Sequence, residues 1–132
     1  MDKLDQIKFI ADQLIALGNL DIVDSSFSAD YVAHAGEKTH NLHKFIKQFT
    51  KQVRTALPDI KISRIEILSQ TENVVTWQRI FSGTHKANLK GIPASNKKVK
   101  WHEIFISRFD KDKIIEEWIV SDLAFQLMIK LK

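Results

Sequence analysis

Near its end the chain reads DKDKIIEEWIVSDLAFQ, residues 110–126, and this stretch decides how the rest is arranged. It predicts a tight turn, then a strand over 113–121, then a short helix that starts after Asp122. Trp118 precedes Asp122 by four residues. A carboxylate at a strand end, close to an aromatic side chain, is a candidate acid or base if the rest of the chain encloses it in a pocket.

The turn at residues 110–112 permits two hairpins. A two-residue loop would pair Phe109 with Ile114. A three-residue loop would pair Phe109 with Lys113 and leave Asp112 in the left-handed conformation, which aspartate tolerates better than most residues. The turn has no Asn-Gly or Asp-Gly pair, the usual signal of the shorter loop. We therefore predict the three-residue loop.

The register of this hairpin decides which side chains share a face of the sheet, because a slip of one residue turns them all over. The predicted register places Ile104 opposite Trp118. The expected pocket face then carries His102, Ile104, Trp118, Val120 and Asp122. The second face is also apolar, with Trp101, Phe105, Phe109, Ile115 and Ile119. Since the chain has helices to cover only one face, we expect a homodimer packed through the second.

The first half of the chain predicts helices. Apolar residues recur at helical spacing over 3–17, after a cap by Asp2 and before Gly18. A short helix near 20–25 and an extended piece over 31–34 follow. A longer helix is capped by Asn41 and ends at Pro58.

After Pro58 the apolar period falls to about two residues, which is typical of strands. Strands are predicted over 60–68, 74–86, 99–109 and 113–121, with a bulge at Ser63-Arg64 where the alternation slips. Helices followed by an antiparallel meander predict an α+β fold, in which N-terminal helices pack on a curved sheet shaped like an open cone.

Composition narrows the class of protein. The 132 residues predict a single domain over 1–132. The absence of cysteine excludes a disulfide framework and a cysteine nucleophile. No long apolar run or signal peptide is present, so we expect a cytoplasmic protein without a membrane partner. The net charge of +4 is spread along the chain, so no nucleic-acid partner is expected.

Several short motifs occur in order over nearly the whole chain: Leu57-Pro58-Asp59, Phe81-Ser82-Gly83-Thr84-His85, Gly91-Ile92-Pro93, Arg108-Phe109, and Ile115-Glu116-Glu117-Trp118 with Asp122. With these motifs the chain resembles the SnoaL-like polyketide (ester) cyclases of the NTF2-like superfamily, whose fold is a cone-shaped α+β barrel. The ordered set is specific for the family and not for a substrate.

The resemblance implies an intramolecular aldol condensation of a small hydrophobic carbonyl compound, with no metal or other cofactor. The aspartate matching Asp122 takes a proton from an activated carbon, the carbanion attacks a carbonyl of the same molecule, and the acid returns the proton to the alkoxide. Poor solvation beside Trp118 would raise the pKa of Asp122. His102 could hydrogen-bond the developing oxyanion.

Other residues are predicted to contact the substrate: Trp118, Ile104, Val120, His85, Tyr31 and His34. Structural alternatives stand beside these roles. Asp122 also suits the N-cap of the last helix, His102 could be held by a partner inside the sheet, and His85 could bond the following loop. The alternative function is a non-catalytic domain whose pocket binds a hydrophobic molecule.

Overall fold

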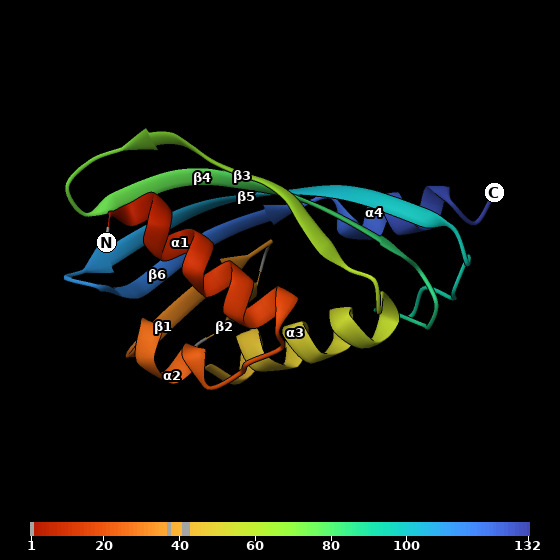
Figure 1. Cartoon of the computed structure of the whole chain (residues 1–132), viewed down its shortest axis with the longest axis horizontal. Coiled ribbons are helices and arrows are strands. Elements are labelled where there is room, and N and C mark those ends of the chain that lie inside the picture. Colours follow the sequence, from red (N-terminus) through yellow and green to blue (C-terminus); the bar gives the residue numbers. More distant parts are fainter. Residues whose placement is uncertain (1, 37, 41–42) are drawn as a thin grey trace.

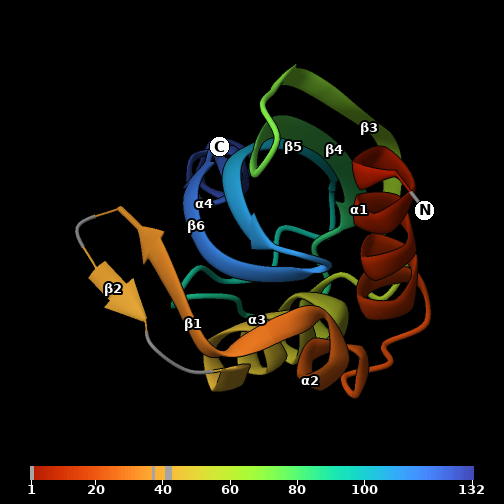
Figure 2. The ribbon, with the colours of Figure 1, turned by 90° about the vertical axis from the view of Figure 1, so that its left-hand side faces the viewer.

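The computed structural model describes residues 2–36, 38–40 and 43–132. Its sheet has the strand order β2-β1-β6-β5-β4-β3. The strands are β1 (Phe27–Ala35), β2 (Lys38–His40), β3 (Lys61–Gln70), β4 (Val74–Thr84), β5 (Lys98–Asp110) and β6 (Lys113–Ser121). The strands curve in an arc, and helices α1, α2 and α3 lie across its open side (Figures 1 and 2). The predicted α+β architecture, helices packed on a curved sheet, is confirmed.

The predicted meander forms β3 to β6, and the register of β3 shifts between Ile62 and Arg64, as the predicted bulge requires. Strand β1 joins the same sheet, which was not predicted from the sequence. It pairs in parallel with β6, placing Ala33 opposite Glu117. A parallel pairing joins segments that are far apart in the chain, so no turn motif between them predicts it.

The helices are α1 (Lys3–Ala11), α2 (Ile22–Ser26), α3 (His43–Ala56) and α4 (Leu123–Ile129), and α1 continues as a π-helical turn over Asp12–Ala16. Asp2 caps α1 as predicted, because its carboxylate accepts a hydrogen bond from the Asp5 backbone N–H at 2.8 Å. Gly18 follows with a positive φ of 67°. The predicted cap Asn41 and the apolar Leu42 lie outside the described residues. Among the described residues, no helix is long and apolar enough to cross a membrane.

The β5–β6 hairpin has the two-residue loop, so the predicted three-residue loop is wrong. Asp110 pairs with Lys113 and Phe109 with Ile114, while Lys111 takes the positive φ of 58°. Contacts from α1 stabilise this turn: the Lys3 ammonium donates to the Lys111 carbonyl at 3.0 Å, and the Gln6 amide donates to the Asp112 carbonyl. The sequence of the turn alone cannot predict these contacts, because they come from helix residues 108 and 106 positions away in the chain.

A bulge in β6 restores the predicted sharing of faces. The register shifts between Arg108 and Phe109, after which Ile104 lies opposite Val120 and Ile106 opposite Trp118. His102 and Ile104 therefore share a face with Trp118 and Val120, as predicted, although the individual partners differ by two residues.

Which face became the interior was predicted wrongly. In β5 the buried residues are Val99, Trp101, Glu103, Phe105, Ser107 and Phe109, whereas His102 and Ile104 are exposed. The face expected to form a dimer interface is thus the inner face, and it packs into the protein's own core. Both faces of the strand pair are apolar, so alternation alone could not decide which one the helices cover.

Candidate functional site

A cavity of about 580 Å³ lies between the inner face of the sheet and the helices. Its wall is mostly apolar and comes from α1 and its continuation, from α3, and from strands β1, β2, β4, β5 and β6, with Lys90 added by the loop after β4. Apolar lining residues include Ile7, Leu14, Phe49, Trp77, Phe105 and Ile119. A space of this size and character suits a small hydrophobic molecule. Polar groups in the wall would then determine how such a molecule is oriented.

Glu117 is a deeply buried carboxylate of this wall. It is 4% exposed, and it lines the cavity from β6. The Tyr31 hydroxyl donates to Glu117 Oε1 at 2.8 Å, and the Ser107 hydroxyl donates to Oε2 at 2.5 Å. Trp77 Nε1 in turn donates to Ser107 Oγ at 2.9 Å. These four residues form a connected network from four different strands.

The surroundings of Glu117 change its proton affinity. Desolvation by burial raises the pKa of Glu117, and this outweighs the hydrogen bonds from Ser107 and Tyr31, which lower it. Burial also raises the pKa of Tyr31, with the nearby Glu117 carboxylate adding to the effect. Tyr31 is therefore a neutral hydroxyl at physiological pH, and Glu117 is a stronger base than an ordinary glutamate.

A second polar pair lies in the same wall. Arg79 on β4 faces Glu103 on β5, with Nε and Nη2 of Arg79 each 2.8 Å from Glu103 Oε1. Ser121 donates to the other oxygen, Oε2, at 3.0 Å. All three residues line the cavity. Among the described residues, the apolar wall thus contains two carboxylates: Glu103 is paired with a cation, and Glu117 accepts hydrogen bonds only from neutral groups.

Asp122 lies outside this cavity, so the predicted placement of its carboxylate in the pocket is wrong. The His102 backbone N–H donates to Asp122 Oδ1 at 2.7 Å, and the Gln126 side-chain amide donates to Oδ2 at 3.2 Å. The carboxylate therefore joins β5 to α4. Asp122 stands at the N-cap position of α4, as the structural alternative predicted, but its side chain makes no capping hydrogen bond. The His102 side chain is exposed and does not line the cavity.

The other predicted contact residues divide between the two faces. Tyr31 lines the cavity, as expected. Ile104 and Val120 are 42% and 70% exposed on the outer face. Trp118 and His34 stack there with ring centroids 5.1 Å apart, and His34 Nε2 lies 2.8 Å from Glu116. These outer-face residues do not line the cavity, because the interior is on the opposite side of the sheet.

His85 is fully buried but is not part of the cavity wall. Its backbone N–H donates to the Lys97 carbonyl at 3.1 Å, and its carbonyl accepts from the Asn96 N–H at 2.9 Å. These bonds attach the end of β4 to the following loop, which is the structural alternative predicted for His85. Within the described residues neither ring nitrogen has a hydrogen-bond partner.

The missed residues are Arg79, Glu103, Ser107 and Glu117. A signal for two of them is present in the sequence, since Glu103 and Ser107 interrupt the apolar alternation Val99, Trp101, Phe105, Phe109. Polar residues in an apolar series indicate either a solvated face or a polar site inside a core. Because the structure shows that Glu103 and Ser107 lie on the buried face, the second of these two interpretations applies.

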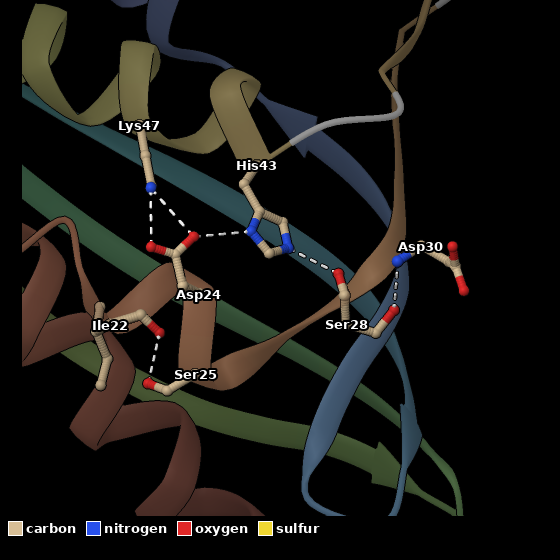
Figure 3. A network of polar contacts seen from close by, with 7 residues as sticks. All are labelled: Ile22, Asp24, Ser25, Ser28, Asp30, His43 and Lys47. Atoms are coloured by element: carbon tan, nitrogen blue, oxygen red, sulfur yellow. Dashed lines mark hydrogen bonds and ion pairs between the residues drawn. The ribbon is translucent and has the colours of Figure 1, made fainter.

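His43 belongs to a separate polar network at the surface, shown in Figure 3. Its Nδ1 lies 3.1 Å from Asp24, its Nε2 lies 2.7 Å from the Ser28 carbonyl, and Lys47 donates to both oxygens of Asp24 at 3.1 Å. The hydrogen bond with His43, followed by that from Lys47, lowers the pKa of Asp24. Both ring nitrogens are engaged, so this network connects α3 to α2 and β1 and leaves no free histidine nitrogen.

Over residues 2–36, 38–40 and 43–132, no group of three or more His, Cys, Asp or Glu side chains is arranged to hold a metal ion. The cavity wall contains carboxylate and hydroxyl groups in hydrogen-bond contact, which are groups that can hold and pass a proton.

Comparison with known proteins identifies the fold. A family model described as SnoaL-like polyketide cyclase matches residues 7–128. IdmH from Streptomyces antibioticus, a proposed polyketide cyclase, is 20% identical with a TM-score of 0.78, and the alignment covers 96% of each chain. A SnoaL-like polyketide cyclase from Agrobacterium tumefaciens is 18% identical with a TM-score of 0.76, over 100% of each chain.

Identities this low show a shared fold and no more. No curated protein matches this chain in sequence. The structural matches confirm the predicted cone-shaped α+β fold of the NTF2-like type.

Proposed function

Since this chain belongs to the SnoaL-like polyketide cyclase family, we propose that it is an acid/base enzyme acting on a small hydrophobic carbonyl compound. The family and the fold support a cyclase-like function. The finer proposal is an intramolecular aldol condensation without a cofactor. One observation carries it: Glu117, bound by Tyr31 and Ser107, lies in the wall of an apolar cavity of about 580 Å³.

The proposed chemistry moves the acid/base role from Asp122 to Glu117. The Glu117 carboxylate takes a proton from a carbon next to a carbonyl, and the C–H electron pair passes to the carbonyl oxygen as an enolate. Burial favours this step, because it raises the pKa of Glu117 toward that of the carbon acid. Asp122, by contrast, accepts a hydrogen bond from the His102 backbone N–H and does not line the cavity.

Ring closure follows inside the same molecule. The enolate carbon attacks a second carbonyl carbon, a C–C bond forms, and the new alkoxide takes the proton that Glu117 received. Neither an oxidant nor a leaving group is involved, so atoms and charge balance. Enclosing a flexible substrate in the cavity brings its two ends together, which lowers the entropic part of the barrier.

The test is exchange of the methyl protons of acetophenone for deuterium, followed by NMR in D2O. This exchange needs only the first step, proton removal next to a carbonyl, and the ketone is small enough for the cavity. We expect the wild-type protein to accelerate exchange and Glu117→Gln to lose about 100-fold or more of that acceleration. Glutamine keeps the acceptor for the Tyr31 hydroxyl but cannot take the proton.

Asp122→Asn is the matched control, and it should exchange like wild type. If Asp122→Asn loses the exchange activity and Glu117→Gln keeps it, the acid/base role belongs to Asp122, as the sequence predicted. Binding of the ketone without any acceleration would favour the alternative function, a non-catalytic domain that binds a hydrophobic molecule.

We further propose that the protein forms a homodimer, with neither nucleic acid nor membrane as a partner, and that it is cytoplasmic. The surface proposed for the dimer is now the outer face of β5 and β6. It carries Ile104, Ile106 and Val120, which are exposed apolar side chains. Exposed apolar groups gathered on one face are typical of an interaction surface.

A further inference from the structure

Arg79 is a cation of the cavity wall, and its neighbours hold it in one place. Its guanidinium Cζ lies 4.6 Å from the ring centroids of both Phe81 and Phe105. Two of its nitrogens contact Glu103, which Ser121 binds from the other side. The side chains of Arg79 and Glu103 are only 12% and 4% exposed. Because its position is set before any ligand arrives, Arg79 loses little freedom on binding one.

The third nitrogen of Arg79, Nη1, is free to bind a ligand. Nη1 makes no hydrogen bond to any of the described residues, whereas Nε and Nη2 contact Glu103. Some buried side-chain nitrogens of the described residues have no hydrogen-bond partner, and they belong to His85 and Trp101, not to Arg79. Nη1 is therefore accessible, on a side chain that lines the cavity.

Arg79 and Glu117 lie on either side of Phe105. The guanidinium lies over the Phe105 ring, and Ser107, the next inward-facing residue of β5, donates to Glu117. A substrate in contact with Phe105 therefore has a proton acceptor and an N–H donor within reach. This is the arrangement that removal of a proton next to a carbonyl requires, since negative charge then develops on the carbonyl oxygen.

The Arg79–Glu103 pair suits a carbonyl better than a permanently charged ligand. The pair is neutral overall, so a neutral ketone enters without burying an unpaired charge. When the ketone becomes an enolate, its oxygen gains a charge-assisted hydrogen bond from Nη1. The interaction is thus stronger after proton removal than before it, which is what accelerates the chemical step.

We propose that Arg79 binds the substrate oxygen through Nη1 and stabilises the enolate formed when Glu117 removes the neighbouring proton. This rests on the proposed function and adds to it that the substrate is an enolisable ketone with its oxygen on Arg79. The C–H bond breaks, its proton goes to Glu117, and its electron pair goes to the oxygen bound by Arg79.

Naphthol is the probe for the test, because its ionised form is a stable aryl oxyanion that resembles an enolate. Neutral and ionised naphthol absorb at different wavelengths, so a pH titration of the bound probe gives its pKa directly. We expect the pKa of naphthol bound to the wild-type protein to be lower, by about one unit or more, than that of naphthol bound to the double variant Arg79→Gln/Glu103→Gln. One unit corresponds to a tenfold change in the ionisation constant. The double variant removes both charges and so leaves none unpaired.

Arg79→Lys is the second variant, and it decides the question if the double variant does not fold. It keeps a positive charge beside Glu103 but has no spare planar N–H, so it should also lose most of the shift. Equal naphthol pKa values on wild type and Arg79→Lys would overturn the proposal, as would failure of naphthol to bind the wild-type protein.

The two proposals fail in different ways. If the Arg79 variants lose the naphthol shift while Glu117→Gln leaves ketone exchange unchanged, the oxyanion site stands and the acid/base role of Glu117 fails. If Glu117→Gln abolishes exchange while the naphthol shift survives Arg79→Lys, the function stands and Arg79 has no part in it.

Discussion

At the scale of the residue, Glu117 makes the stability of the fold depend on pH. Its ordinary pKa is 4.5, and burial raises the pKa in the native state. Between the unfolded and native values the native state holds more protons, so the contribution of Glu117 is fully present below the unfolded pKa and is lost as pH rises through the native pKa. The glutamine of Glu117→Gln is neutral at every pH. We therefore expect the free energy of unfolding of this variant to fall less than that of wild type as the pH rises from the unfolded to the native pKa of Glu117. Urea unfolding at a series of pH values measures this.

A difference between wild type and Glu117→Gln that stays constant over the whole series would contradict the raised pKa. The same experiment with Glu116→Gln is the control, since Glu116 is on the outer face of the same strand, beside His34 and Arg108.

Asp122 has a structural role that can be separated from catalysis. Asp122→Ala removes the acceptor of the His102 backbone N–H, so we expect a loss of about 1–2 kcal/mol in the free energy of unfolding. Asp122→Asn keeps an oxygen at this place and should lose less. Urea unfolding of the two variants checks both values, and equal stability of wild type and Asp122→Ala would show that the contact contributes nothing.

At the scale of the element, the end of β4 packs against the turn that follows α3. A Cβ at Gly83 would lie 3.1 Å from two atoms of Leu57 and 3.3 Å from the Ile60 backbone. Leu57 is fully buried, so it has little room to move. We expect Gly83→Ala to destabilise the protein by about 1–3 kcal/mol through overpacking. Thermal unfolding measures the loss.

Lys100→Ala, at an exposed position of β5 opposite Ser82, is the control and should change the free energy of unfolding by less than about 0.5 kcal/mol. A Gly83→Ala protein as stable as this control would mean that the strand can move away from α3 without loss.

At the scale of the whole molecule, the outer face of the sheet predicts self-association. A two-fold dimer places the same patch on both partners, so one lysine substitution introduces two charges into the interface. We expect wild type to sediment at about twice its 15.2 kDa mass at micromolar concentration and Val120→Lys to sediment as a monomer. Leu17→Lys, exposed at the end of the π-helical turn, is the control. A monomeric wild type would exclude this dimer.

Local patterns determined most of the elements. Apolar spacing located α1 and the strands β3 to β6, and the slip at Ser63-Arg64 located a bulge. Alternation placed His102 with Ile104 on one face of β5 and Trp118 with Val120 on one face of β6, although the bulge that aligns these two faces was not predicted. These features depend on neighbours a few residues apart, which the sequence displays directly. The ordered motifs likewise indicated the family, which residues 7–128 match.

The interior of the cone was decided only in the tertiary structure. Both faces of β5 and β6 can be buried, and the choice depends on where α1 and α3 pack. The site also depends on the parallel pairing of β1 with β6, which brings Tyr31 to Glu117 across 86 residues of sequence. No local signal encodes such a contact, because its stability comes from burial and hydrogen bonds that exist only when the whole sheet has formed.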